Sequence, residues 1–430
     1  MFLLLEREGG RLSSGAGVAT ALAMLTASCS CGMEATSSTD DGQGGATSSA
    51  TGSSVATGTS TTSGSGGAPP SGWSTVDEGL TPCPLYRPDR TAELPEMTLV
   101  ACTLAGWSGC RKWEPEWERS AYSAIIDTRF DSRSTPVRVG ALLFPEDNNM
   151  AVSYRLPGGA PEVAIRSAAT CFLSPLVPAG TDSSWLVVGN VESGGTWGHY
   201  SLSADYKLDK VGFDATVELT VGEAGGNEWF LGGVPLSGST AHIWDNEQSM
   251  AHSVPAGLGG SVFGVEYLTD GVLFTLVEAD KSTRVVFQKQ GGQLVQSVVQ
   301  AAPNRYVLQA VVRGGNLIWT ESTKSPADGA GAGAVMTAPW SSVGPFPLAG
   351  TEVGQLDPVT IFAASENHLV TYNLQQAALD VMQLSDGVVT SMPSPATGNF
   401  FRGLKFVGDD GLGGEALWVN THDALYRLAF

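Results

Sequence analysis

Short runs that alternate apolar and polar residues, each opened by a turn, recur along most of the chain. In "GGNLIWTE" at residues 314–321, a Gly-Gly turn leads into alternating residues that place Trp319 on one face of a predicted strand. Similar runs end at seven aromatic residues: Tyr154, Tyr200, Trp244, Phe274, Trp319, Tyr372 and Trp418. Their successive intervals are 46, 44, 30, 45, 53 and 46 residues. The chain therefore contains a repeat.

Each repeat holds further short apolar runs on both sides of the aromatic run. Residues 139–144 lie upstream of the first aromatic residue, and residues 284–288 lie downstream of the fourth. Three or four short strands in each unit of about 44 residues are typical of a β-propeller blade. We therefore predict an all-β, seven-bladed β-propeller. Six and eight blades are the alternatives, because the 30-residue interval makes the third unit thin.

The aromatic residues fit this architecture as packing. Blades stack face to face around a ring, so each face of a blade is buried by its neighbour. An aromatic residue at the same blade position in all seven units would fill the space between blades, burying roughly 150 to 250 Å² each. We expect Trp319 to be a packing residue and not part of a site.

The ring must also close. The last repeat shows three strands before Phe430, and an extra strand at residues 120–130 precedes the first repeat. We expect that extra strand to complete the last blade, so that the first and last blades are tied together and their edges are hidden. The propeller would span residues 120–430. Residues 74–119 would form a cysteine-containing lead-in or cap. The two tryptophans of its segment 110–119, Trp113 and Trp117, would cover the mouth of the ring or stack on a sugar.

The first 28 residues are typical of a signal peptide. Two arginines precede an apolar run from Ala16 to Ala27, which is too short to cross a bilayer. The sequence Leu-Thr-Ala-Ser-Cys at residues 25–29 resembles the bacterial lipobox. This resemblance implies that lipid is attached to Cys29 and that the chain is cut just before it. An ordinary secretory leader is the alternative.

Residues 29–73 consist mainly of Ser, Thr, Gly and Ala. Such a segment cannot bury enough apolar surface to fold, so we predict a disordered tether. The order of lipobox, tether and repeat domain resembles the propeller lipoproteins of Gram-negative bacteria, particularly the Ser/Thr/Gly-linked ones of myxobacteria. The resemblance implies an exported protein anchored in the cell envelope, in the outer membrane on its periplasmic or surface side. It carries over no functional residue.

Four cysteines lie early in the folded part: Cys83, Cys102, Cys110 and Cys171. In an exported protein an even, clustered set predicts two disulfides, and three pairings are possible. We favour Cys102 with Cys110 and Cys83 with Cys171. Zinc is the competing interpretation, but the cysteines have neither a Cys-x-x-Cys spacing nor a nearby histidine, so we predict no metal site here.

Charge narrows the range of partners. The net charge of −20 would repel phosphate backbones and anionic lipid. We therefore expect no nucleic-acid partner, and contact with a membrane only through the lipid anchor.

No catalytic motif is found, so no catalytic residue is assigned. The folded part lacks Gly-x-Ser-x-Gly, His-Glu-x-x-His and Gly-x-x-x-x-Gly-Lys sequences. Several acids follow the aromatic runs, on loops that we expect to emerge on one ring face: Asp245, Glu247, Glu278, Glu321 and Asp423. No cofactor is predicted, although calcium would suit such loops. The leading hypothesis is a non-catalytic binding or protein-interaction module with a protein or glycan ligand. The alternative is a glycan-active hydrolase or lyase that uses the acidic face.

Overall fold

A computed structural model describes Pro69 and most of residues 71–430. The gaps are residues 70, 77–83, 91–93, 95, 108, 116–124, 132–136, 144–149, 157–158, 168–172, 174–175, 180–183, 190–197, 211–219, 226–227, 233–241, 246–249, 254–260, 279, 290–293, 296, 330, 360–361, 374, 396–400, 408–409 and 422–423. For β13 to β16 the structure describes only the backbone course. The predicted signal peptide and nearly all of the predicted tether lie outside the described residues. So do Cys29, Cys83, Cys171, Glu247 and Asp423.

The described strands form seven sheets, and five of these are four-stranded blades whose strands follow one another in chain order. The first two of the five are β9 (Val177–Ala179), β10 (Ser184–Gly189), β11 (Gly198–Ser203), β12 (Leu208–Lys210), and β13 (Thr220–Gly225), β14 (Glu228–Gly232), β15 (His242–Asp245), β16 (Met250–Ser253). The next is β17 (Ser261–Leu268), β18 (Gly271–Val277), β19 (Thr283–Lys289), β20 (Leu294–Val295). The last two are β21 (Tyr306–Arg313), β22 (Asn316–Ser322), β23 (Gly331–Pro339), β24 (Thr351–Val359), and β25 (Phe362–Ala364), β26 (His368–Asn373), β27 (Ala378–Gln383), β28 (Val389–Pro393).

The other two sheets contain strands from the start of the folded part. The six-stranded sheet has the order β1-β2-β8-β7-β6-β5, and the five-stranded sheet has the order β29-β30-β31-β4-β3. Their strands are β1 (Trp73–Thr75), β2 (Leu85–Pro88), β3 (Met97–Ala101), β4 (Arg111–Pro115), β5 (Ile125–Asp131), β6 (Arg138–Leu143), β7 (Met150–Arg155), β8 (Pro161–Ser167), β29 (Phe401–Val407), β30 (Ala416–Thr421) and β31 (Leu425–Ala429). Among the described residues the one helical element is the short 3₁₀ helix η2 (Pro326–Asp328).

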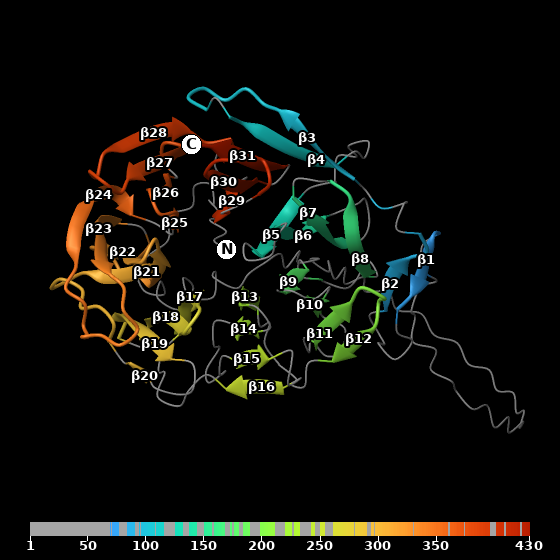
Figure 1. Ribbon diagram of the computed structural model, residues 1–430, viewed down its shortest axis with the longest axis horizontal. Helices are drawn as coiled ribbons and strands as arrows, with labels where there is room; N and C mark the ends of the chain where they lie inside the picture. The colour runs from blue at the N-terminus through green and yellow to red at the C-terminus, as the bar shows by residue number, and fades with distance from the viewer. Residues whose placement is uncertain are drawn as a thin grey trace, which may run out of the picture.

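The sheets are arranged around a ring with their first strands innermost (Figure 1). The first strands contact one another in the cyclic order β5, β9, β13, β17, β21, β25, β29 and back to β5. Core strands are buried on both faces, as the stacking of blades requires. In β22, for example, Leu317 and Trp319 enter one apolar cluster, whereas Ile318 on the opposite face enters the next. The prediction of an all-β propeller is confirmed.

The ring is closed by a different strand from the one that we predicted. The last strand of the chain, β31, pairs with β4, with Leu425 opposite Trp113 and Arg427 opposite Arg111. Residues 125–131 form β5, which pairs with β6 as the first strand of its own sheet. Closure by residues 120–130 was therefore the wrong prediction. The described parts of the segment 74–119 supply edge strands to two neighbouring sheets, and Trp117 lies outside the described residues. Trp73, which we had placed in the tether, begins β1.

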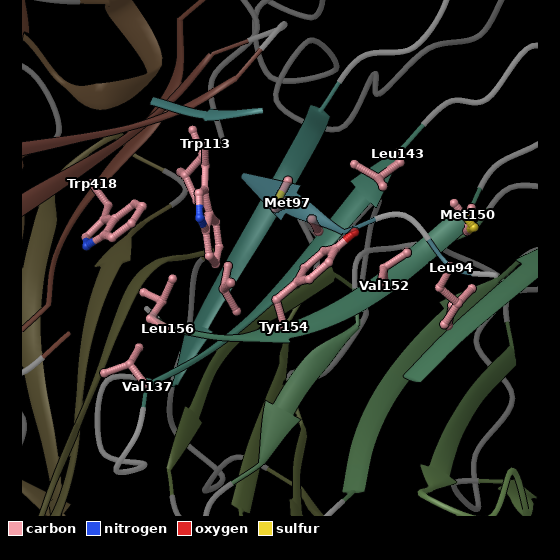
Figure 2. Packing of buried hydrophobic residues seen from close by; sticks show 14 of the residues in the cluster. Leu94, Met97, Trp113, Val137, Leu143, Met150, Val152, Tyr154, Leu156 and Trp418 are labelled. Atoms are coloured by element: carbon pink, nitrogen blue, oxygen red, sulfur yellow. The ribbon is translucent and has the colours of Figure 1, made fainter. Parts of the chain in front are cut away.

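A buried aromatic cluster explains why β4 is the closing strand. Trp113 of β4 is fully buried, with its ring centre 5.7 Å from that of Trp418 and 6.0 Å from that of Tyr154. Figure 2 shows the Trp113 side chain between the other two. These three residues come from β4, β30 and β7. The N-terminal strand thus brings a large ring into the junction between the last sheet and the first.

The seven repeat aromatics do not share one blade position. Tyr154, Tyr200 and Trp244 lie on the third of the strands that follow one another in their sheets, at β7, β11 and β15. The other four lie on second strands, at β18, β22, β26 and β30. The 30-residue interval marks this change of strand and not a thin unit. All six whose side chains are described are buried, so the interpretation of Trp319 as a packing residue is confirmed.

The predicted disulfide between Cys102 and Cys110 is confirmed. It closes the loop between β3 and β4, with the two Cα atoms 5.3 Å apart. Trp107 in this loop donates from Nε1 to the carbonyl of Pro393, 3.3 Å away, and meets the ring of Phe430 edge-on. The loop therefore joins the closing sheet to β28. Within the described parts of the chain there is no helix with the length and apolarity of a membrane-spanning segment.

Candidate functional site

The three predicted acids that the structure describes, Asp245, Glu278 and Glu321, do not gather on one face. Glu278, which follows β18, forms an ion pair with Arg284 at 2.5 Å. Glu321 in β22 is only 2 % exposed and accepts hydrogen bonds from Trp319 Nε1 at 3.0 Å and from the Ala302 amide at 3.1 Å. Glu321 is therefore part of the packed interior, where it satisfies a buried indole.

Asp245 lies at the other end of the ring. It is the last residue of the third strand in its sheet, whereas Glu278 follows a second strand. Neighbouring antiparallel strands run in opposite directions, so the ends of second and third strands lie at opposite ends of the blades. The change of strand at the 30-residue interval separates these two acids.

Two adjoining cavities lie at the end of the ring where first strands turn into second strands. Their volumes are about 540 and 770 Å³, within the range of small-molecule sites. Three residues line both cavities: Arg313, Glu366 and Asn367. The walls come from four successive sheets, those that begin with β17, β21, β25 and β29. We take this pair of cavities as the candidate binding site.

Arg313, the last residue of β21, joins three of these sheets. Its guanidinium forms an ion pair with Glu266 of β17. Arg313 Nη1 also donates a hydrogen bond to the carbonyl oxygen of Val312 at 2.6 Å, and Nε donates to the carbonyl oxygen of Ala364 in β25 at 3.0 Å. The Glu266 side chain is 9 % exposed and that of Arg313 27 %. A partly desolvated pair with these additional hydrogen bonds holds the shared wall of the two cavities in place.

A second network surrounds Glu415, which precedes β30. Its carboxylate accepts hydrogen bonds from the Ser365 hydroxyl, from Asn367 Nδ2 at 3.0 Å and from His368 Nδ1 at 2.7 Å. Burial acts to raise the pKa of Glu415, but these three hydrogen bonds outweigh it and lower the pKa. When Nδ1 donates, the Nε2 of a neutral imidazole is left as an acceptor. His368 lines the smaller cavity, and its ring stacks on Phe430 at 4.7 Å.

The turn that carries these donors is held from both sides. The amides of Asn367 and His368 donate to Ser365 Oγ at 3.2 and 2.9 Å, which fixes the turn internally. On its other side, Glu366 lies against Gly314 of the neighbouring blade. A Cβ on Gly314 would stand 2.6 Å from Glu366 Cγ, and Gly314 has a φ of +55°, so a glycine is favoured there.

A buried ion pair supports the loop that leads to Glu415. Asp410 is 1 % exposed and forms an ion pair with Arg427 of β31, which also donates to the Gly413 carbonyl at 2.8 Å. Trp418 Nε1 donates to the same carboxylate at 3.2 Å. Gly414 and Glu415 line the larger cavity, so this interior pair positions one of its walls.

The larger cavity also has an apolar side. Trp340 and Phe406 contribute to its lining. The Trp340 amide donates to the Gly315 carbonyl at 2.9 Å, and its ring meets Phe287 edge-on at 5.2 Å. The indole is therefore fixed beside the polar wall formed by Arg313.

Ser365 and His368 both lie beside Glu415, but they are not paired with each other through their side chains. The Ser365 hydroxyl donates to Glu415 and to the backbone carbonyl of His368 at 3.3 Å, whereas the His368 ring bonds to Glu415, so the hydroxyl and the imidazole are not hydrogen-bonded as nucleophile and base. Among the described residues no group of three or more His, Cys, Asp and Glu side chains could hold a metal ion.

Sequence reasoning missed Arg313, His368 and Glu415 as site residues. All three flank turns between first and second strands, in the stretches "RGGN", "SENH" and "GLGGE". With the correct strand order, polar residues beside these turns would have been predicted at one end of the ring.

Comparison with known proteins supports the fold alone. No family model matches the chain, and no curated protein matches it. Among solved structures, an oligogalacturonate lyase in complex with manganese has a TM-score of 0.51 at 10 % identity, covering 78 % of this chain and 96 % of that one. The β-propeller domain of Cps50 (Swd1) from Myceliophteria thermophila has a TM-score of 0.47 at 8 % identity, covering 78 % and 100 %. The β-propeller domain of the Trilobed protease from Pyrococcus furiosus has a TM-score of 0.46 at 11 % identity, covering 71 % and 95 %.

Proposed function

We propose that the protein is a lipid-anchored β-propeller of the cell envelope that acts as a non-catalytic binding module, with its ligand in the two adjoining cavities. The observation that carries this proposal is the fixed polar wall of the cavities. Arg313 and Glu415 each tie neighbouring sheets together, so the lining is held before any ligand arrives, which reduces the entropic cost of binding.

The ring in this proposal has seven blades. The meander β5 to β8 counts as one blade, and β29 to β31 with β4 counts as another, beside the five four-stranded blades. The cyclic contacts among the seven first strands support this count. The remaining strands, β1, β2 and β3, are then additions at the outer edges.

The anchor in this proposal is Cys29, with residues 1–28 as its signal peptide and the Ser/Thr/Gly-rich segment as a tether. A flexible tether of about 43 residues has an end-to-end distance on the order of 35 Å, so the propeller would reach ligands away from the bilayer. The proposed location is the outer membrane, on its periplasmic or surface side, with no nucleic-acid partner.

Binding is tested with the purified mature protein and a panel of fluorescently labelled bacterial polysaccharides. We expect saturable binding by anisotropy, no new reducing ends after prolonged incubation, and loss of binding in Arg313→Ala. Arg155→Ala is the matched control, because Arg155 also pairs with a glutamate, Glu162, but lies away from the cavities. New reducing ends, absent from a heat-treated sample, would show a glycan-cleaving enzyme instead.

The anchor is tested separately by metabolic labelling with an alkyne fatty acid. We expect label on the wild type and on Cys31→Ala, and none on Cys29→Ala. Label that survives Cys29→Ala would refute the lipid anchor without affecting the binding proposal.

A further inference from the structure

We propose that the ligand of the two cavities is an uncharged carbohydrate chain long enough to occupy both. This inference rests on the proposed binding function and names its ligand class. It follows from the charge of the lining, the kind of polar groups in it, and the way that the cavities adjoin.

The charge of the lining opposes an anionic ligand. Four carboxylates line the larger cavity against two cations, Arg313 and Lys405. Arg313 is already engaged with Glu266. The whole chain carries a net charge of −20. An anionic polymer would therefore approach against repulsion and find no unengaged arginine to receive it.

The same lining does not provide a strong cation site. The most desolvated carboxylates are Glu266, which holds Arg313, and Glu415, which accepts three hydrogen bonds. Glu366 is exposed and Asp270 is half-buried in a turn. Attraction between a cation and carboxylates so close to water is weak, because solvent screens it.

The polar side chains of the lining match a ligand that carries several hydroxyl groups close together. Asn316, Asn367 and Gln383 present amides, each of which both donates and accepts hydrogen bonds. Glu366 adds two acceptor oxygens at the wall shared by the cavities. Sugar hydroxyls also donate and accept at once, so they match a lining of mixed donors and acceptors better than a purely cationic or anionic group does.

Trp340 supplies the apolar partner that a sugar ring needs. One face of a pyranose ring is covered by C–H groups, and an indole offers a flat apolar surface with a polar edge. Trp340 lines the larger cavity beside Arg313 and Glu366. The ligand would rest a sugar ring on the indole while its hydroxyl groups face the polar wall.

The two cavities share one wall, so an extended ligand can occupy both. Their volumes of about 540 and 770 Å³ adjoin at Arg313, Glu366 and Asn367. Each volume alone is in the range that encloses a small ligand. A chain of several sugar units would fill both, whereas a disaccharide would fill only one.

The test is isothermal titration calorimetry of the purified mature protein with cellohexaose, laminarihexaose and maltohexaose, compared with hexalysine and hexagalacturonate. We expect at least one neutral hexasaccharide to bind, with the matching disaccharide at least tenfold weaker. Trp340→Ala should weaken binding at least tenfold, and the exposed Asn316→Ala several-fold. Trp73→Ala is the matched control, because Trp73 is a partly buried tryptophan on a distant edge strand. It should leave the affinity unchanged.

The outcomes separate this inference from the proposed function. Binding of hexalysine or hexagalacturonate alone, weakened by Arg313→Ala, would overturn the carbohydrate class while leaving a binding site in the cavities. Neutral binding that is unaffected by both Trp340→Ala and Asn316→Ala would also overturn the inference, as would failure of all five hexamers to bind. Shortening of a neutral hexasaccharide during the titration would support the ligand class but refute a non-catalytic function. Because Asn316 is exposed, its variant gives a result even if Trp340→Ala fails to fold.

Discussion

Replacing Trp113 by alanine should weaken the junction at which the last sheet meets the first. Trp113 is fully buried between Tyr154 and Trp418, and it is the residue by which β4 enters the apolar core of that junction (Figure 2). Its backbone pairs with Leu425 of β31. The variant keeps the backbone pairing but removes the ring that gives this pairing its apolar support.

The expected loss of stability follows from the buried area. A buried tryptophan removes about 200 Å² from water. At about 25 cal/mol per Å², this corresponds to about 5 kcal/mol, at the upper end of the 3–5 kcal/mol found for Phe or Trp to Ala changes in cores. Domains are stable by only about 5 to 15 kcal/mol, so the variant should lose a large part of its stability.

The assay combines guanidinium unfolding, followed by far-ultraviolet circular dichroism, with limited proteolysis. Trp319→Ala is the matched control, because Trp319 is almost equally buried but packs in a different cluster, between two blades that follow each other in the chain. Both variants should unfold at lower denaturant, but only Trp113→Ala should become cleavable within residues 97–115. A loss below about 1 kcal/mol, or cleavage of that segment in both variants, would refute the view that Trp113 secures closure.

Three further predictions concern the supports of the site. Asp410→Ala leaves Arg427 buried without its counterion and should lower the free energy of unfolding, measured by thermal unfolding, by about 3–5 kcal/mol. Asp209→Ala removes one partner of an exposed ion pair and should change the free energy of unfolding little. Cys102→Ser opens a disulfide with a sequence separation of 8 and should cost about 2.5 kcal/mol in guanidinium unfolding; an unchanged midpoint in reducing and oxidising buffer would contradict this. The folded pKa of Glu415 is lowered, so the unfolded chain binds more protons, and the stabilisation by Glu415 is present at neutral pH and lost as pH falls below about 4. The melting temperature should therefore fall more between pH 7 and pH 3 in the wild type than in Glu415→Gln. An equal fall in the two proteins would contradict this role of Glu415.

The sequence was sufficient to predict the propeller, because the repeated turns and aromatic runs indicate short buried strands at regular intervals. It was insufficient for assigning each run to a strand within a blade. Tyr154 and Phe274 both follow a turn and an upstream apolar run, yet one lies on a third strand and the other on a second. A periodic pattern defines the length of the unit but not where the unit begins. The second and third strands whose burial is described are mostly buried on both faces and pair with a strand on each side, so local alternation does not distinguish a second strand from a third.

Closure was mispredicted for a related reason. The segments at 111–115 and 125–131 are both short strands that precede the first repeat, and either could pair with β31. The choice depends on contacts between residues far apart in the chain, above all the ring of Trp113 against Trp418. Such contacts leave no trace in local alternation.

The site could not be found because its residues are ordinary when taken singly. Arg313, Glu366 and His368 belong to polar turns of a kind that occurs on any soluble protein. They become a site only because the turns of neighbouring blades meet at one end of the ring, where Arg313 reaches Glu266 across one joint and His368 reaches Glu415 across another. The disulfide between Cys102 and Cys110, by contrast, joins residues that are close in the sequence and could be predicted from their spacing.

The pairing of β4 with β31 joins strands that lie far apart in the chain, with almost all of the other described strands between them. Closing so long a loop has a high entropic cost, so this pairing should form late in folding. Until it forms, Trp113 is uncovered and an edge of β4 is unpaired, and such an edge can pair with another chain. The seam is therefore the place at which slow folding would lead to association between copies of the protein.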